Sequence, residues 1–143
     1  MSDVLGAQKT LFDAGTILKP GLFDGRVKCL VDTYEASTLA NPSTITMSNK
    51  LTKGAIVLAV FLAWDDMGAS VTLDVGDAAD VDRYIDGQDV SSASSKLVSL
   101  VDGIAYETTE SDADNLDTQI LITVGGAGTA SGTIKLIVFY TND

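Results

Sequence analysis

The sequence predicts an all-β fold, a single antiparallel β-sandwich preceded by an irregular N-terminal arm. Its 12 Ser and 15 Thr stand beside only 3 Glu and 2 Arg, so residues that favour strands and turns outnumber good formers of exposed helices. Several short segments alternate apolar and polar residues with the period of two that is typical of half-buried strands. A length of 143 residues, 45% of them hydrophobic, suits one domain with its own core.

The arm is predicted for residues 1–25 and the sandwich domain for 26–143. Glycine and proline interrupt every period in the arm, although it carries many apolar side chains. We expect the apolar side chains of such a segment to be buried, either against its own sandwich or against a neighbouring subunit. The residues expected to make assembly contacts are Leu11, Phe12, Leu22 and Phe23.

Four strands are expected in the first half of the domain, at 26–34, 44–48, 55–64 and 70–75. Ala55–Trp64 is apolar on both faces, which predicts a central strand covered on both sides. The second cover must then be the arm or another subunit. Asp65–Gly68 is interpreted as a tight hairpin turn. Cys29 lies between Val27 and Val31 and is interpreted as a small core residue.

The second half is expected to hold a long polar loop and four more strands. The loop is predicted over 77–95, with one helical turn at Val81–Ile85 and a flexible or extended linker at Ser91–Ser95. The strands are expected at 96–101, 104–109, 118–124 and 133–140, the last with Ile134, Leu136, Val138 and Tyr140 on one face. Asp102-Gly103 and Gly125–Gly132 are interpreted as hairpin loops. About eight strands favour a jelly-roll-like sandwich.

The composition argues against several classes of function. The chain has no histidine, which removes the commonest general base, the usual zinc ligand and any Ser-His or Cys-His pair. One cysteine excludes an internal disulfide and a site with several thiolates. A net charge of −11 argues against binding nucleic acid or an anionic membrane surface. Because these groups are missing, we expect a protein without enzymatic activity, cofactor or metal. No signal peptide is apparent in Met1–Gly15, so we expect it in a reducing cytosol or assembled there into something larger.

The segments that resemble chemical sites also have simpler interpretations. The acidic stretch Asp74–Asp89 carries carboxylates that calcium prefers, but EF-hand spacing from Asp82 fails at the third and twelfth positions. We interpret it as a solvated loop held by a salt bridge from Arg83 or a backbone cap by Asp80. The glycine loop lacks the Gly-Lys-Ser/Thr of a phosphate-binding loop. The carboxylate pairs Asp65/Asp66 and Glu107/Glu110 lie at strand ends, where charge is ordinary.

Several short sequence segments resemble those of a known protein family. They are Leu51–Ala55, Asp66–Asp77, Asp80–Gly87, Asp102-Gly103 with Tyr106, and Ser131–Leu136. Over about residues 45–143 the chain resembles small structural proteins of tailed bacteriophages, including capsid decoration (cement) proteins. The resemblance implies a jelly-roll-like, non-enzymatic body, often a homotrimer, that binds between major capsid subunits on the outer surface of a phage head. Its location would be the virion, with assembly in the cytoplasm of the host bacterium.

Two other interpretations stay open. A carbohydrate- or calcium-dependent binding module on the same fold would use the acidic loop 77–89 and exposed aromatic side chains. Alternatively, the chain is a virion component located at the connector, the tail or a head fibre.

Overall fold

The computed structural model describes residues 14–16, 26–47, 51–98, 105–108 and 119–141. This part of the chain consists of strands and connections, and it contains no helix, which confirms the all-β prediction. The strands are β1 (Val27–Ala40), β2 (Ser43–Thr46), β3 (Ile56–Trp64), β4 (Val71–Gly76), β5 (Ile85–Asp89), β6 (Ser94–Leu97), β7 (Tyr106–Glu107), β8 (Leu121–Gly126) and β9 (Thr129–Thr141). Within the described ranges, no helix has the length and apolar character needed to cross a membrane.

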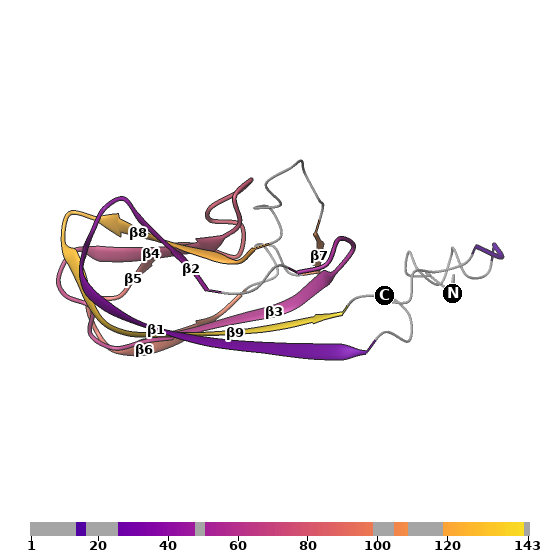
Figure 1. The fold of residues 1–143 in the computed structure, drawn as a ribbon, viewed down its shortest axis with the longest axis horizontal. Coiled ribbons are helices and arrows are strands. Elements are labelled where there is room, and N and C mark those ends of the chain that lie inside the picture. Colours follow the sequence, from indigo (N-terminus) through magenta and orange to yellow (C-terminus); the bar gives the residue numbers. More distant parts are fainter. Residues whose placement is uncertain (1–13, 17–25, 48–50, 99–104, 109–118, 142–143) are drawn as a thin grey trace, which may run out of the picture.

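The strands form two antiparallel sheets that pack face to face, as the predicted β-sandwich requires (Figure 1). Sheet A has the order β1-β9-β3-β6, and β7 also pairs with β3. Sheet B has the order β2-β8-β4-β5. Figure 1 shows sheet A as the lower layer and sheet B as the upper layer.

Most connections in this sandwich pass from one sheet to the other. The chain runs from β1 in sheet A to β2 in sheet B, returns to β3, crosses again to β4, and later passes from β8 to β9. The first and last strands pair along most of their length, from Val27 opposite Thr141 to Ala40 opposite Thr129. β9 therefore fills the space between β1 and β3 and completes the middle of sheet A.

The core lies between the two sheets and is lined by alternate residues of each strand. In β9, Ile134, Leu136 and Val138 are buried, while Ile137 is half-buried and Phe139 exposed on the other face, as the alternation predicts. The facing residues of sheet B that are fully buried include Leu73, Val75, Ile122 and Val124. This core is closed within one chain, so the sandwich has the packing of an independent unit.

Two predicted hairpins are wrong, because each connects strands of different sheets. Asp65–Gly68 leads from β3 in sheet A to β4 in sheet B, and these strands do not pair. Gly125–Gly132 spans the crossing from β8 to β9 and overlaps both strands. Gly126 has φ +84°, and a Cβ there would clash with the carbonyl oxygen of Ser70. Glycine at this position thus serves a tight crossing between sheets.

The predicted loop 77–95 also differs from the structure. It contains β5 and the start of β6, and residues 77–84 form turns and bends without a helical turn. Asp102-Gly103 lies outside the described residues. However, β6 and β7 both pair antiparallel to β3, so they run in the same direction and do not form a hairpin with each other.

Candidate assembly surface

The face of sheet A that points away from the core carries continuous rows of apolar side chains. Residues paired across strands point to the same face. The register aligns Val31 with Ile137, Ile137 with Phe61, and Phe61 with Leu97, which makes one row across four strands. We call the following set the outer face: Val27, Cys29, Val31, Ala59, Phe61, Ala63, Leu97, Ile137 and Phe139.

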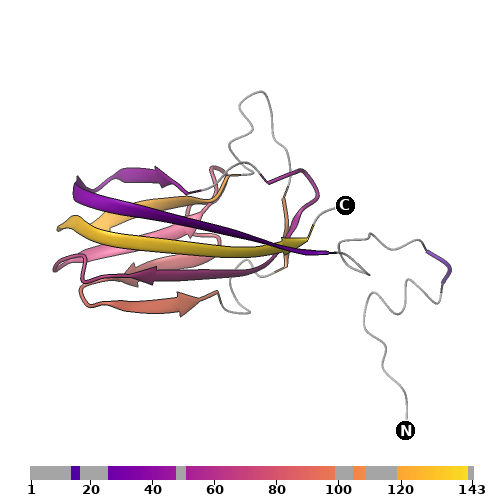
Figure 2. The same cartoon turned by 60° about the horizontal axis from the view of Figure 1, so that its bottom comes forward.

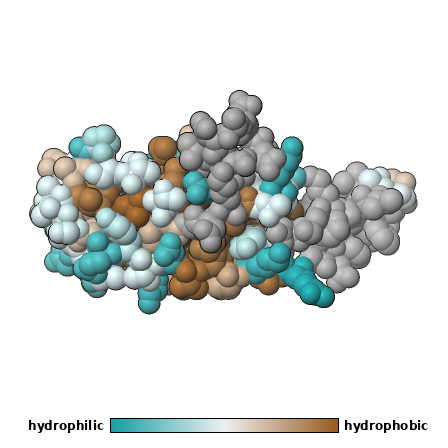
Figure 3. Space-filling view, in the orientation of Figure 1, coloured by the Kyte–Doolittle hydropathy of each residue, from teal (hydrophilic) through white to brown (hydrophobic). Residues whose placement is uncertain are grey.

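The outer face is open to solvent in the described part of the chain. Val27 is 61% exposed, Val31 59%, Leu97 56% and Phe139 39%. Figure 2 turns sheet A toward the viewer and shows β1, β9, β3 and β6 side by side. Figure 3 shows hydrophobic residues in the middle of the lower margin, on the side of sheet A, with hydrophilic residues to their left. The apolar segment Ala55–Trp64 therefore has one face in the core and the other at the surface.

The prediction that Cys29 is a core residue is wrong. Cys29 is exposed and is paired with Phe139 in the row next to Val31. The reason is that β1 turns its other face inward, where Leu30 and Tyr34 pack against the core. The inward face also carries Lys28 and Asp32, so sequence alternation alone favours burial of Cys29, and the pairing of β1 with β9 decides otherwise.

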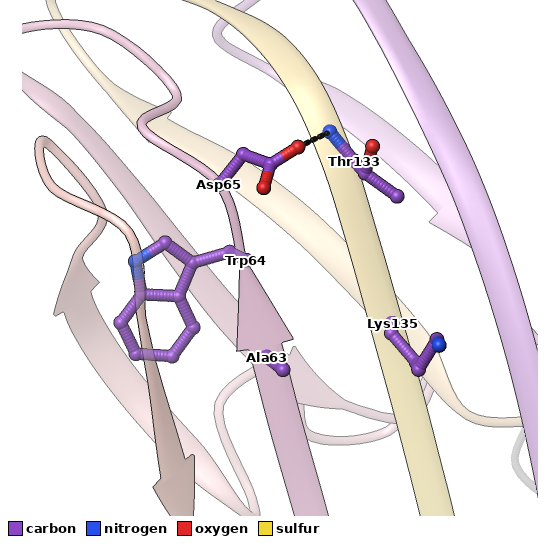
Figure 4. A pocket seen from close by; sticks show the side chains of 5 residues that line it. All are labelled: Ala63, Trp64, Asp65, Thr133 and Lys135. Atoms are coloured by element: carbon purple, nitrogen blue, oxygen red, sulfur yellow. Dashed lines mark hydrogen bonds between the residues drawn. The ribbon is translucent and has the colours of Figure 1, made fainter.

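A polar margin ends the outer face near the end of β3. A shallow pocket of about 220 Å³ is lined there by Ala63, Trp64, Asp65, Thr133 and Lys135 (Figure 4). The Asp65 carboxylate accepts a hydrogen bond from the Thr133 backbone N–H at 3.2 Å, and the Thr133 hydroxyl donates to Glu35 at 2.7 Å. The Trp64 indole N–H donates to the Ser92 carbonyl at 2.8 Å. These hydrogen bonds fix the side chains of Trp64, Asp65 and Thr133 at this margin.

The acidic loop is organised around one buried carboxylate. Asp77 is 1% exposed, and it accepts hydrogen bonds from the backbone N–H groups of Ala79 and Asp80, both at 3.0 Å. Arg83 donates to Asp77 through Nε at 2.8 Å and lies over the Tyr106 ring, 3.9 Å from its centroid. The predicted salt bridge from Arg83 is confirmed, but the backbone cap comes from Asp77 and not from Asp80. Within the described residues, no group of three or more His, Cys, Asp or Glu side chains is placed to hold a metal ion.

Two pKa shifts follow from this packing. Burial raises the pKa of Tyr84, and the negative charge of Asp77 adds to the shift. Its hydroxyl is buried, and no described residue hydrogen-bonds to it. Burial pushes the pKa of Arg83 down, but the hydrogen bond and charge of Asp77 outweigh this and hold it above its usual value. Both groups keep their ordinary protonation state at neutral pH, so the contacts of Arg83 with Asp77 and Tyr106 serve to fix the loop.

The candidate carboxylate pairs are also accounted for in part. Asp65 and Asp66 are exposed, and each accepts a backbone hydrogen bond, from Thr133 and from Gly68 respectively. Glu107 is half-buried in β7, while Glu110 lies outside the described residues. The predicted assembly contacts Leu11, Phe12, Leu22 and Phe23 lie outside them as well.

We expect Asp82→Asn to raise the melting temperature at pH 7. A hydrogen bond to Asp80, followed by desolvation and the charges of Asp80 and Asp86, raises the pKa of the Asp82 carboxyl. A raised carboxyl pKa means that the folded state disfavours the charged form, so stability falls as pH rises through the folded-state pKa. The gain should vanish at about pH 3, where this carboxyl is largely protonated in both states.

Asp89→Asn is the matched control for this thermal measurement. Hydrogen bonds from the backbone and side chain of Ser91 lower the pKa of Asp89. A lowered pKa contributes stability above the unfolded-state pKa, which is lost as pH falls through the folded-state pKa. Asp89→Asn should therefore lower the melting temperature at pH 7. The same sign of change for both variants would contradict this assignment.

The chain was compared with protein families, curated proteins and solved structures. No protein family model matches the sequence, and no curated protein matches it. A chain of the capsid asymmetric unit of cyanophage Pam1 has a similar structure, with a TM-score of 0.70 and 29% sequence identity, over 83% of this chain and 86% of that one. The resemblance to phage structural proteins is confirmed. A chain of the capsid of Ralstonia phage GP4 shares the fold, with a TM-score of 0.62 and 18% identity over the same shares of the two chains.

These neighbours support a structural protein of a phage virion. Components of a capsid associate with one another, and an open apolar face on a closed sandwich is the kind of surface that association uses. The outer face of sheet A is therefore the candidate assembly surface of the described part of the chain.

Proposed function

We propose that this chain is a capsid decoration (cement) protein, which binds the outer surface of a phage head and stabilises it without enzymatic activity. The observation that carries the proposal is the structural match to a chain of a phage capsid over most of the length of both chains. The closed core supports it, because an independently packed sandwich can be added to a lattice as a separate piece. The open outer face supplies apolar area for such contacts.

The proposal includes specific partners. The chain would form a homotrimer and contact the major capsid protein, with Leu11, Phe12, Leu22 and Phe23 of the arm as contacts. It would be located on the head surface of the virion, after assembly in the cytoplasm of the host bacterium. A jelly-roll topology is part of the proposal, supported by the repeated crossing between sheets and the pairing of first and last strands. The net charge of −11 disfavours nucleic acid and anionic membranes as partners.

The test is to add purified protein back to heads of the same virus that lack it. We expect the full chain to sediment with the heads and to raise their resistance to heat, because a ligand bound only to the intact form stabilises that form. A chain lacking residues 1–25 should remain folded but lose head binding. Circular dichroism and thermal unfolding check that its sandwich is intact.

Two results would count against the proposal. If the full chain does not bind heads and is instead found on tails, connectors or head fibres, the virion role holds but the decoration role is wrong. If the truncated chain binds heads as well as the full chain, the arm is not the capsid contact. The calcium-dependent module has less support, because the buried Asp77 of the acidic loop is already engaged with Arg83 and two backbone N–H groups.

A further inference from the structure

We propose that the outer face of sheet A, together with the free edge of β1, is where a second copy of this chain packs. The inference rests on the proposed homo-oligomer and names the surface at which its subunits meet. Three features of the structure lead to it: the uncharged centre of the face, the acidic residues gathered in β4, β5 and their loop, and the edge of the long strand β1, with which no described strand pairs.

The centre of the outer face is apolar and uncharged. Its two central rows are Val31-Ile137-Phe61-Leu97 and Cys29-Phe139-Ala59. The charged side chains that share this face among the described strands are Glu35, Glu107 and Lys135, and the register places them in rows toward its ends. Apolar side chains in the middle with polar groups around them are the arrangement of a protein–protein interface.

The β4–β5 half of sheet B does not suit a second copy. Over 71–90, which holds β4, β5 and their loop, Arg83 is the one basic residue among six carboxylates. These are Asp74, Asp77, Asp80, Asp82, Asp86 and Asp89. Asp77 is buried and paired with Arg83, but the other five would make two copies that meet through this half repel each other. β2 and β8 carry no charge but present mainly threonine and glycine there, so the outer face of sheet A is the uncharged surface that also offers large exposed apolar side chains to another copy of the same acidic chain.

The free edge of β1 extends the surface. β1 is 14 residues long and pairs with β9 on one side, and no described strand pairs with its other side. A long exposed edge strand presents backbone donors and acceptors to a neighbouring chain. Strand spacings of about 4.8 Å and rises of about 3.3 Å per residue give the nine residues of the outer face roughly 300 Å². That is less than half of the approximately 800 Å² per partner of a standard interface, so the edge and the polar margin must supply the rest.

The single cysteine offers a direct probe, because Cys29 lies in a central row of the face. The native mass of the full chain is measured by light scattering after size exclusion, together with the rate at which Cys29 reacts with a maleimide. We expect an oligomer in which Cys29 reacts slowly. Val31→Lys and Leu97→Lys should each reduce the mass to one chain and speed the reaction about tenfold, as the thiol becomes accessible.

Val81→Lys is the matched control, since Val81 is a similarly exposed valine, at 47%, on the acidic side. It should leave both mass and Cys29 reactivity unchanged. Thermal unfolding of each variant shows that the sandwich remains folded, as expected for side chains that are already exposed.

The possible failures separate this inference from the proposed function. If both lysine variants remain oligomeric and Cys29 reacts freely, the copies meet at another surface and the inference is wrong. The proposed decoration function would not be affected by that result. A monomer whose Cys29 is protected only on phage heads would assign the face to another capsid protein and overturn the inference. A monomer with reactive Cys29 under all conditions would overturn it too, while head binding would still test decoration separately.

Discussion

Leu136→Ala is expected to lower the free energy of unfolding of the subunit by about 2–5 kcal/mol. Leu136 is fully buried in β9, the strand between β1 and β3, and is paired with Leu62 of β3. Removing its side chain loses the transfer free energy of the deleted atoms and leaves a cavity between two sheets whose backbones are fixed by hydrogen-bonded ladders. Urea unfolding followed by tryptophan fluorescence measures the change, with Trp64 as the single reporter.

Ile137→Ala is the control, because Ile137 is the next residue and points to the outer face. In a monomeric subunit it should cost at most about 1 kcal/mol, since the side chain is only half-buried. The measurement is made in the Leu97→Lys background, so that contacts between copies do not contribute. Equal losses for the two variants would contradict the assignment of the two faces.

Asp77→Ala is expected to destabilise the subunit by about 3 kcal/mol. The substitution leaves the guanidinium of Arg83 without its closest partner and leaves the N–H groups of Ala79 and Asp80 without an acceptor. Arg83 also lies over Tyr106 of β7, so this cluster connects the loop after β4 in sheet B to a strand of sheet A. Its loss should weaken that end of the sandwich, which chemical denaturation and hydrogen exchange of the loop both measure.

Asp80→Ala provides the comparison for this cluster. The side chain of Asp80 is 44% exposed and lies 3.7 Å from Arg83, so its ion pair is worth at most about 1 kcal/mol. Asp77→Asn keeps an acceptor for the two backbone N–H groups but removes the charge, and it should fall between the two alanine variants. If Asp80→Ala proves as damaging as Asp77→Ala, the buried carboxylate is not the organising group.

Most of the strands were predictable because side-chain alternation is a local property, whereas β5 lies in a segment predicted as a loop. The alternation of Ile134, Leu136 and Val138 against Ile137 and Phe139 is present in the sequence and appears unchanged in β9. The connections were not predictable in the same way. The residue types of a turn such as Asp65–Gly68 suit a hairpin within one sheet and a connection between two sheets equally well. That choice depends on contacts between residues far apart in the sequence.

The candidate assembly surface also depends on contacts between distant residues, which local sequence patterns do not contain. Alternation places Val27, Cys29 and Val31 on one side of β1, but Leu30 and Tyr34 on the other side are apolar too. Only the pairing of β1 with β9 decides that the first set is exposed and the second packs on the core. Leu97 joins the outer face because it pairs with Phe61, a contact between residues 36 positions apart that no local pattern contains.

The position of β9 has a consequence for how the subunit is made. β9 is the last strand of the sandwich in chain order, yet it lies in the interior of sheet A between β1 and β3. On the ribosome, β1 and β3 emerge long before the strand that joins them, so sheet A cannot close until synthesis has passed Thr141. A nascent chain therefore has no complete outer face to offer to other copies. The proposed association of copies through this face is therefore delayed until translation of the sandwich is complete.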